Sequence, residues 1–408
     1  METVSDAIIV GGGPCGSFAA LNLAKHGFNV RVFEEHEEIG VPCHCTGHLS
    51  IKGLRNLGLY PLPDGIIENV FYGANIHSPS GKTLSVRFSQ PVTCIVNRAL
   101  FDKHIAEKAE NIDAQYCLNS QVKSLIVKDN FVKGASVRLN GEVDCKFAAK
   151  IMVDAEGISS RILRQTGLQP LNREMLVNAV QAEVENVKDV EPDMVDVFLG
   201  KHYAPGFYAW LAPKHDGKAK VGLAAQTGNP KEFLQKLICN HPIASRKLRA
   251  ARILRSTFHP ISLGGPIPKA CSNGFLAVGD AASHVKPTTG GGVIMGMNCA
   301  RIAAEVAHEA LYADDFSSNF LSKYQKRCEK LLGFDMKAML RIRKMLNALS
   351  DKKMDDAIGF CAKLGLDKTF RNVEDIDFQG QALIHALRSP RILSTLFYLF
   401  FLHLSANP

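Results

Sequence analysis

Three glycines near the start of the chain have a spacing that suits phosphate binding. Gly11, Gly13 and Gly16 form a G-x-G-x-x-G pattern directly after the apolar stretch 4–10. In this pattern the first glycine permits a tight turn, the second lets the backbone approach a pyrophosphate, and the third lets helix and strand pack closely. The free N–H groups at the start of the following helix would hold the phosphates.

An acid stands where such a fold places its ribose contact. Glu34 follows a second apolar stretch, 29–33, which comes after the predicted helix. Strand, glycine turn, helix, second strand and terminal acid are therefore all in order. This combination predicts a nucleotide-binding βαβ unit with Glu34 accepting hydrogen bonds from a ribose.

Two later segments repeat the combination of a strand, an acid and glycines. Asp154 ends the apolar strand 151–154 and is followed by Ala-Glu-Gly. Asp280 ends the apolar strand 274–280, and three glycines follow at 290–292. Asp280 at a strand end can accept hydrogen bonds from sugar or ribityl hydroxyls, and the glycines let backbone N–H groups approach a flat ring.

The remaining patterns place these segments on predicted elements. Helical spacing predicts a helix over 97–110, and alternation predicts strands between 121 and 139. A β-like region over 176–226 reads as a separate sheet. A helix over about 292–311 and a mostly helical remainder from 316 complete the chain.

Composition narrows the class of protein. The 408 residues are 46% apolar and carry a formal net charge of +8, with no long block of like charges and no nucleic-acid motif, so no nucleic-acid partner is expected. The cysteines stand mostly alone and the chain enters its first strand at once, which favours a cytoplasmic location without a signal peptide. The apolar segment 392–404 is too short to cross a bilayer; it either lies in the interface as a peripheral membrane contact or caps the core.

Together the three acid-and-glycine segments resemble the FAD-dependent oxidoreductases of the p-hydroxybenzoate hydroxylase fold, over roughly residues 4–310. The resemblance implies FAD as cofactor, with its ADP half on the first loop and its ribityl and pyrophosphate at Asp280. Glu156 departs from the usual Asp of the family's D-G segment, and Arg98 matches an arginine that reaches towards the cofactor. The implied cofactor contacts are Gly11, Gly13, Cys15, Gly16, Glu34, Cys45, Thr46, Gly47, Arg98, Val122, Asp280, Gly290, Gly291, Gly292 and Val293.

Two motifs are similar to the geranylgeranyl reductase branch of this fold. The sequence P-G-F-Y-A-W-L-A-P over 205–213 resembles P-x-x-Y-x-W-x-F-P, which lines that branch's prenyl tunnel; Ala212 stands where the branch has Phe. The sequence C-T-G-H-L-S over 45–50 resembles its cysteine-glycine loop near the flavin, with Cys43 offering a rival alignment. The resemblance implies substrate contacts from Pro205, Phe207, Tyr208, Trp210 and Pro213, and catalytic roles for Cys45, Tyr208 and Trp210.

The implied activity is saturation of C=C bonds of geranylgeranyl chains in archaeal-type membrane lipid biosynthesis, by hydride transfer from reduced FAD. The expected partners are a geranylgeranylated lipid or prenyl diphosphate and an electron donor, which is NAD(P)H, ferredoxin or another reduced carrier. The proton donor stays open among Cys45, His44, His48 and Tyr208.

Other functions share part of these signals. A flavin monooxygenase that hydroxylates an apolar substrate has the same FAD motifs, whereas the W-x-W-x-I-P motif of halogenases is absent from the sequence. A non-enzymatic flavin-binding protein is a third reading. Cys43, His44, Cys45 and His48 lack a second well-spaced ligand pair, so no metal site is expected there or elsewhere.

The expected fold is therefore α/β: a Rossmann-like FAD-binding domain of p-hydroxybenzoate hydroxylase type, an inserted antiparallel-sheet substrate domain and a helical C-terminal region. The expected boundaries are 1–70, 97–170 and 266–312 for the FAD-binding domain, 71–96 and 171–265 for the substrate domain, and 313–408 for the helical region.

Overall fold

The computed structural model describes residues 4–215, 217–365, 376–380 and 398. The predicted interfacial segment 392–404 lies outside the described residues, except for Tyr398, whose ring stacks on Phe360 at 4.2 Å. The chain forms two compact units. The first contains Met1–Cys43, Arg98–Glu174 and Ser262–Met336, and the second contains His44–Asn97, Met175–Ile261 and Lys337–Pro408.

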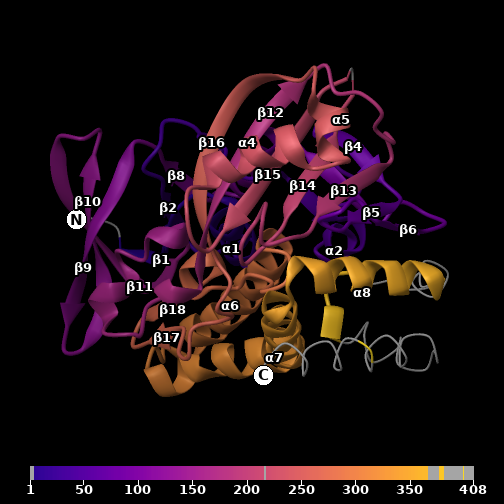
Figure 1. The fold of residues 1–408 in the computed structure, drawn as a ribbon. Coiled ribbons are helices and arrows are strands. Elements are labelled where there is room, and N and C mark those ends of the chain that lie inside the picture. Colours follow the sequence, from indigo (N-terminus) through magenta and orange to yellow (C-terminus); the bar gives the residue numbers. More distant parts are fainter. Residues whose placement is uncertain (1–3, 216, 366–375, 381–397, 399–408) are drawn as a thin grey trace. The chain divides into compact units, whose positions relative to one another are not determined.

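The first unit is built on a sheet with a parallel centre (Figure 1). Where its central strands pair in parallel they are mostly apolar, as strands buried on both faces are. Ile8, Ile9 and Val153 are fully buried. The strand order is β17-β18-β11-β1-β2-β8, with β1 Ser5–Val10, β2 Val30–Phe33, β8 Gln115–Cys117, β11 Val143–Asp154, β17 Cys271–Ser272 and β18 Phe275–Ala277.

The parallel register brings four strand ends to the same level. Val10 of β1 pairs with both Phe33 of β2 and Asp154 of β11, and Asp154 pairs with Ala277 of β18. The loops that follow these strands therefore leave the sheet at one carboxyl edge, where α/β folds bind their ligands. We call this edge the nucleotide edge; it carries the glycine loop, Glu34, the residues after Asp154, and Asp280.

One strand of this unit takes part in two kinds of pairing. The first half of β11 pairs antiparallel with β10 (Phe131–Leu139), which in turn pairs with β9 (Ser120–Lys128); its second half, from Ala149, pairs parallel with β1. Gly134 of β10, at φ +149°, lies so close to β11 that a Cβ would meet the Phe147 carbonyl oxygen at 2.0 Å. This contact, next to a register shift in β10, excludes any side chain at position 134.

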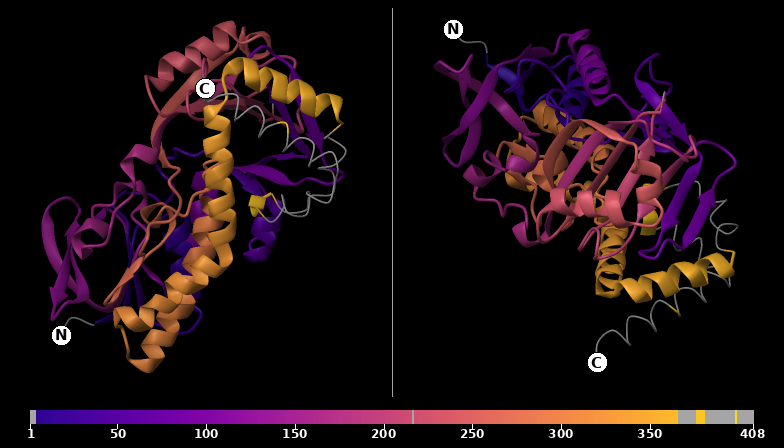
Figure 2. Two further views of the ribbon diagram at one scale, coloured as in Figure 1. Left: turned by 60° about the horizontal axis from the view of Figure 1, so that its bottom comes forward. Right: turned by 45° about the horizontal axis from the view of Figure 1, so that its top comes forward.

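Helices complete the first unit. They are α1 Pro14–Ala24, α3 Arg98–Glu110, α6 Val293–Ala313 and the first part of α7, which runs from Ser318 to Ala348. Glu309 of α6 accepts ion pairs from Arg327 at 2.6 Å and Lys323 at 3.4 Å of α7, so these helices lie side by side (Figure 2).

The second unit contains a seven-stranded sheet of order β16-β12-β15-β14-β13-β5-β6 and a three-stranded sheet of order β3-β7-β4. Strand β5 pairs parallel with β13, whereas β12 with β15, β15 with β14, β14 with β13, β5 with β6, β3 with β7 and β7 with β4 pair antiparallel. The bounds are β3 His48–Ser50, β4 Ile67–Phe71, β5 Gly73–His77, β6 Thr83–Arg87, β7 Thr93–Val96, β12 Leu176–Glu185, β13 Met194–Phe198, β14 Ala209–Pro213, β15 Ala219–Ala225 and β16 Arg252–Ser262.

The two faces of the larger sheet differ. One face packs Leu211, Val221 and Leu223 against Leu234 of α4 (Pro230–Asn240) and Leu248 of α5 (Ala244–Leu248). Because side chains alternate along a strand, the residues between these point to the opposite face. The cross-strand row Gln181, Gly222, Trp210 lies on that opposite face.

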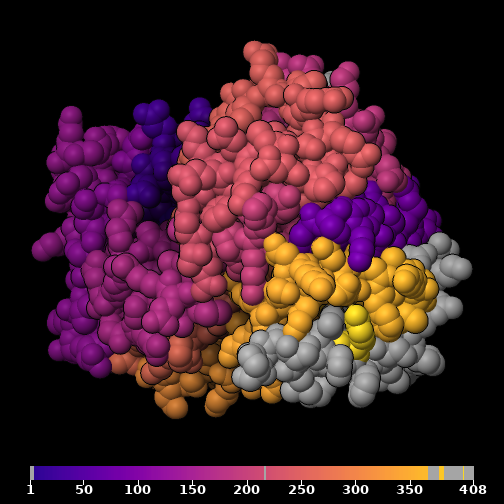
Figure 3. Space-filling model, in the orientation of Figure 1, coloured from indigo at the N-terminus to yellow at the C-terminus, as the bar shows by residue number. Residues whose placement is uncertain are grey.

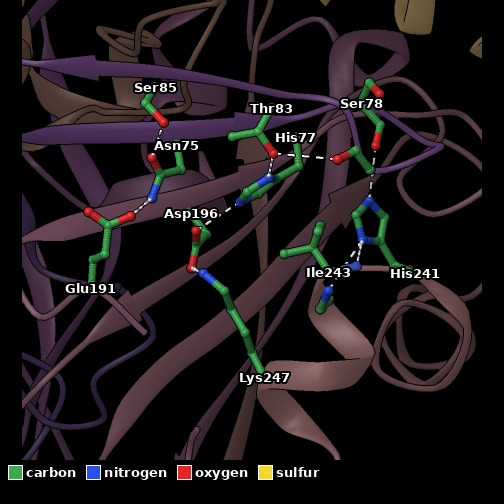
Figure 4. Close-up of polar contacts among 12 residues, drawn as sticks. Asn75, His77, Ser78, Thr83, Ser85, Glu191, Asp196, His241, Ile243 and Lys247 are labelled. Carbon is green, nitrogen blue, oxygen red and sulfur yellow. Dashed lines mark hydrogen bonds and ion pairs between the residues drawn. The ribbon is translucent and has the colours of Figure 1, made fainter. Parts of the chain in front are cut away.

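Near one end of this sheet a charged network is buried (Figure 4). Asp196 of β13 accepts from His77 Nε2 at 2.8 Å and from Lys247 Nζ at 2.6 Å. His241 donates from Nε2 to the Ser78 carbonyl at 3.1 Å. These bonds join β5, β13, α5 and the turn after α4. They also pair the buried charge of Asp196, which would be strongly destabilising without a partner.

The helical C-terminal region includes α8, Asp351–Lys363. Its buried side chains Ile358 and Cys361 pack with Leu84 of β6, and Figure 3 shows α8 against the β5–β6 hairpin. Asp351, the first residue of α8, accepts the backbone N–H of Lys201 with its carboxylate at 2.6 Å. The structure thus confirms the predicted combination of a parallel nucleotide-binding sheet, a second sheet and a helical C-terminal region. A further helix, α2 Ile51–Asn56, belongs to the second unit.

Candidate active site

The glycine loop has the close contacts that its spacing predicts. Gly11 has φ +93°, and a Cβ on it would meet the Ala155 carbonyl oxygen at 2.6 Å. A Cβ on Gly16 would meet the Gly11 carbonyl oxygen at 1.9 Å. Gly13, in contrast, has no heavy atom near its missing Cβ, and no side chain caps the start of α1. The loop is therefore closed towards the sheet and open towards a ligand, as a pyrophosphate site requires.

Glu34 is fastened to this loop. Its Oε2 accepts the Gly12 N–H at 2.7 Å, and its Oε1 accepts the His36 N–H at 3.0 Å. Each carboxylate oxygen has two acceptor sites, so the position of Glu34 is fixed while capacity for a ribose hydroxyl remains. The side chain is only 11% exposed, and its two backbone bonds define its orientation.

Asp280 lies at the same edge, in the short helix η4 (Gly279–Ala282). A Cβ on Gly292 would meet its Oδ1 at 2.9 Å, so the carboxylate lies against the start of α6. Burial raises the pKa of Asp280, and the nearby charge of Arg98 opposes that shift. Arg98 itself is held by two bonds to Asp102, at 2.9 and 2.8 Å. The structure thus brings Arg98 and Asp280, two predicted cofactor residues, close to each other.

The acidic segment after β11 has a structural role. The Glu156 carboxylate accepts the backbone N–H groups of Arg161, Ile162 and Leu163 at 2.8 to 3.0 Å. Asp154 is fully buried, its Oδ2 has no partner among the described residues, and burial with the Glu156 charge raises its pKa well above the ordinary value. Glu156, which is longer than the usual Asp of the D-G segment, therefore stabilises the turn that follows by accepting its backbone N–H groups.

Three other predicted cofactor residues lie in the first unit. The Cys15 thiol fits into a notch at Gly279 and Gly296, since a Cβ on either would come within 2.9 Å of its Sγ. Val122 is buried in β9, opposite Val137. Val293 begins α6 directly after the predicted glycines 290–292.

The predicted substrate motif forms an aromatic group in the second unit. Phe207 stacks on Tyr208 at 4.3 Å, and the rings of Tyr208 and Trp210 meet edge to face at 5.9 Å. Burial raises the pKa of Tyr208, so its phenol stays protonated. Trp210 Nε1 has no partner among the described residues. The ends of the motif are anchored by the backbone, since the Pro205 carbonyl accepts from Gln226 N–H at 2.8 Å and the Pro213 carbonyl from Asn69 Nδ2 at 2.9 Å.

The predicted cysteine-glycine loop is fastened to the same sheet. Thr46 Oγ1 makes a short hydrogen bond to Gln181 Oε1, and Lys220 Nζ donates to the Thr46 carbonyl at 2.9 Å. Gly47, at φ +76°, donates its N–H to Cys45 Sγ at 3.3 Å.

Gln181 and Lys220 point to the face that carries Trp210, because Gln181 and Trp210 both pair with Gly222, and Lys220 lies two residues from it. We call this surface the aromatic face: Phe207, Tyr208 and Trp210 with the loop 45–47 and its two holders. The structure therefore places Tyr208 and Trp210 together on one face of one sheet, and it fastens the loop that carries Cys45 to the same face through Thr46.

Two residues of this site escaped the sequence analysis. Gln181 and Lys220 are polar residues in strands whose other residues are mostly buried and apolar, and Lys220 is only 8% exposed. A polar side chain inside such a strand is a usable signal, because its burial requires a partner. The partner, Thr46, is far away in the sequence and could not be named from it.

The sequence matches a known family of cofactor-binding domains. The FAD binding domain family matches residues 4–259, more than half of the chain. Within the residues that the structure describes, no helix is both long and apolar enough to span a bilayer.

Curated relatives cover most of the chain. The digeranylgeranylglycerophospholipid reductase of Methanocaldococcus jannaschii is 31% identical over 87% of this chain and 90% of its own length. The digeranylgeranylglycerophospholipid reductase 2 of Methanopyrus kandleri is 33% identical over 86% of this chain and 88% of its own.

Solved structures agree. A geranylgeranyl bacteriochlorophyll reductase-like protein of Thermoplasma acidophilum superposes with a TM-score of 0.85 at 28% identity, covering 97% of this chain and 99% of its own. A myxobacterial chondrochloren halogenase, with a TM-score of 0.71 at 18% identity over 98% of this chain and 97% of its own, shares the fold. The chain belongs to the digeranylgeranylglycerophospholipid reductase family of FAD-dependent oxidoreductases.

Proposed function

We propose that this protein saturates the isolated C=C bonds of geranylgeranyl chains in precursors of archaeal-type membrane lipids. The observation that carries the proposal is the aromatic face, where Tyr208, Trp210 and the Cys45 loop share one side of a sheet. The names of the relatives support the choice of a prenyl lipid over other apolar substrates.

FAD, held by the nucleotide edge, would supply the hydride; that chemistry belongs to the cofactor. The glycine loop would bind its pyrophosphate, Glu34 a ribose hydroxyl, and Asp280 a ribityl hydroxyl. The tight contacts at Gly11 and Gly16 and the open side of Gly13 support this assignment.

The aromatic face would bind and orient the chain. Each buried CH₂ group contributes about 0.8 kcal/mol, so an apolar surface can hold a prenyl chain without any polar contact. Phe207, Tyr208 and Trp210 would also exclude water, which keeps the reacting double bond in a dry environment.

The protein must also deliver a proton. We propose that Cys45 orients the double bond or delivers that proton. Its loop is held in one position by the bond from Gly47 N–H to Cys45 Sγ and by the two hydrogen bonds of Thr46. Tyr208 is the second candidate donor, since burial keeps its phenol protonated. Cys45→Ala should lower the rate or change the number of double bonds reduced. Cys117→Ala, a half-buried thiol of the first unit, is the matched control.

The deciding experiment is an anaerobic reaction of the FAD-loaded protein with a geranylgeranylated glycerophospholipid, followed by mass spectrometry. Stepwise gain of two hydrogen atoms per double bond is the expected result. A hydroxylated product that forms only with oxygen would instead identify a monooxygenase. If the bound flavin does not turn over with any prenyl lipid, the enzymatic proposal is wrong.

The electron donor and the location form the last part of the proposal. NADH, NADPH and reduced ferredoxin are the carriers to compare by anaerobic bleaching of the flavin.

A substrate embedded in lipid calls for a peripheral position at the membrane surface, which the net charge of +8 favours for anionic membranes. Sedimentation with anionic vesicles, lost at high salt and absent with neutral vesicles, is the expected result.

A further inference from the structure

Three metal-ligating side chains meet inside the first unit, beside the segment that carries Asp280. His284 follows η4, Cys299 belongs to α6 and Cys328 belongs to α7. One donor atom from each lies within 4.8 Å of the other two, and the three residues are 2%, 0% and 7% exposed. Three separate elements thus place two thiols and an imidazole at one buried point.

One ring nitrogen of His284 has no hydrogen-bond partner among the described residues. This atom, Nδ1, is buried. Its backbone is fixed, since the His284 N–H donates to the Gly279 carbonyl at 3.0 Å. A buried polar atom without a partner costs free energy, which a bound ion would recover.

The donor set defines the class of ion. Two sulfurs and one nitrogen, with no carboxylate among the three donors, favour Zn(II) or Cu(I) over Mg(II), Ca(II) or Mn(II). With Zn–S near 2.3 Å and Zn–N near 2.0 Å, bound donors lie roughly 3.5–4 Å apart, so a small inward movement from the present separation suffices. Two thiolates also balance a divalent charge, which suits a buried site.

We propose that His284, Cys299 and Cys328 form a binding site for one thiophilic d¹⁰ metal ion, Zn(II) or Cu(I). The site is independent of the reductase reaction and departs from the sequence-based expectation of no metal. Bound to these three donors, the ion would tie the segment that carries Asp280 to α6 and α7. The thiols would lose their protons on binding, as metal-bound cysteines do.

The test uses the purified FAD-loaded protein after treatment with a chelator. Co(II) serves as the optical probe for the Zn(II) arm, read at wavelengths beyond flavin absorption, and Cu(I) is titrated anaerobically in the second arm. We expect one equivalent of either Co(II), displaced by Zn(II), or Cu(I), together with a rise of Tm on binding. Cys299→Ser and Cys328→Ser should each abolish stoichiometric binding, and His284→Asn should weaken it at least tenfold.

Two buried thiols of the second unit provide controls. Cys94→Ser and Cys361→Ser remove equally buried sulfurs outside the cluster and should bind the ion as the wild type does. Retained flavin absorbance and circular dichroism show that each variant is folded, and Cys299→Ala and Cys328→Ala replace any serine variant that is not.

Three results would overturn the proposal: no stoichiometric ion on the wild type in either arm, binding that persists in both cysteine variants, or a Cys299–Cys328 disulfide in protein purified anaerobically. Because no readout depends on turnover, failure here leaves the proposed function unaffected.

Discussion

The indole of Trp210 lies across Gly222 of the neighbouring strand. A Cβ at position 222 would come within 2.5 Å of Trp210 Cζ2 and 2.7 Å of the Val180 carbonyl oxygen. The two residues are direct partners in the β14–β15 pairing, so the glycine provides the space in which the indole lies flat on the sheet. The geometry of the aromatic face therefore depends on a residue that has no side chain.

Gly222→Ala should displace the indole and reduce turnover of a prenyl substrate. Overpacking of this kind costs about 1–3 kcal/mol of stability. The same free energy lost from the transition state corresponds to roughly a 5- to 150-fold lower kcat/KM, which is the effect we expect. Flavin content should not change, because the glycine loop belongs to the other unit. Gly333→Ala, on helix α7 with open space around its missing Cβ, is the control and should be neutral. Unchanged kcat/KM in Gly222→Ala would refute this role of the indole.

Lys220→Met should loosen the loop that carries Cys45. The change removes the 2.9 Å bond to the Thr46 carbonyl and the 3.3 Å ion pair with Glu68. A hydrogen bond from a charged donor contributes about 1.5–3 kcal/mol, so kcat should fall tenfold or more. FAD affinity should fall less than kcat, because the glycine loop and Glu34 remain intact and only the predicted contacts of the loop 45–47 are disturbed. Lys220→Arg, which keeps the charge, should retain more activity. A fall in FAD affinity in place of kcat would contradict the assignment.

Glu34→Ala should weaken FAD binding. It removes the acceptor for the Gly12 N–H and the expected ribose contact, so a loss of about 2–3 kcal/mol, near a hundredfold in Kd, is expected. Glu34→Gln keeps one acceptor oxygen and should lose less. Fluorescence titration of the flavin-free protein measures the effect, and the exposed Glu37→Ala is the control. Equal Kd values for Glu34→Ala and Glu37→Ala would exclude the contact.

His241 should make the protein less stable in mild acid. Burial, reinforced by the nearby His77, lowers its pKa from 6.5 to about 4, although its bond to the Ser78 carbonyl opposes the shift. The folded state thus favours neutral His241, and this contribution is complete above pH 6.5 and is lost as the pH falls towards 4. The expected loss in the free energy of unfolding is roughly 2–3 kcal/mol.

Urea unfolding at several pH values tests this prediction. His241→Leu should be less stable than the wild type at pH 7, because the N–H groups of Ile243 and Ala244 lose their acceptor, yet its stability should vary less between pH 6.5 and 4.5. His215→Leu, at an exposed position, should keep the wild-type pH profile. An unaltered profile in His241→Leu would assign the acid sensitivity to other groups.

Local signals in the sequence predicted the first unit well. The glycine spacing, the apolar strands and the terminal acids each depend on a few neighbouring residues, and the parallel register brings their loops to one edge. The P-G-F-Y-A-W motif likewise predicted an aromatic group because its rings are close in the sequence.

Such local signals could not predict the pairings between distant segments of the chain. The bonds from Thr46 to Gln181 and Lys220 join residues more than 130 positions apart. The insertion of β5 beside β13, and the packing of residues 44–70 with the second unit, also depend on long-range contacts. The contacts of the Glu156 carboxylate are local, to backbone N–H groups five to seven residues further on, but no motif predicted them.

The double pairing of β11 has a consequence for the cofactor loops. The same continuous strand pairs with β10 and with β1, so a shift of β11 by one residue would turn Asp154 to the opposite side of the sheet and offset Ala155 from Gly11. Gly134 prevents such a slip, because only a residue without a side chain fits against Phe147. The β9–β10 hairpin thus helps to fix the register of the strand whose carboxyl end leads into the nucleotide-binding turn.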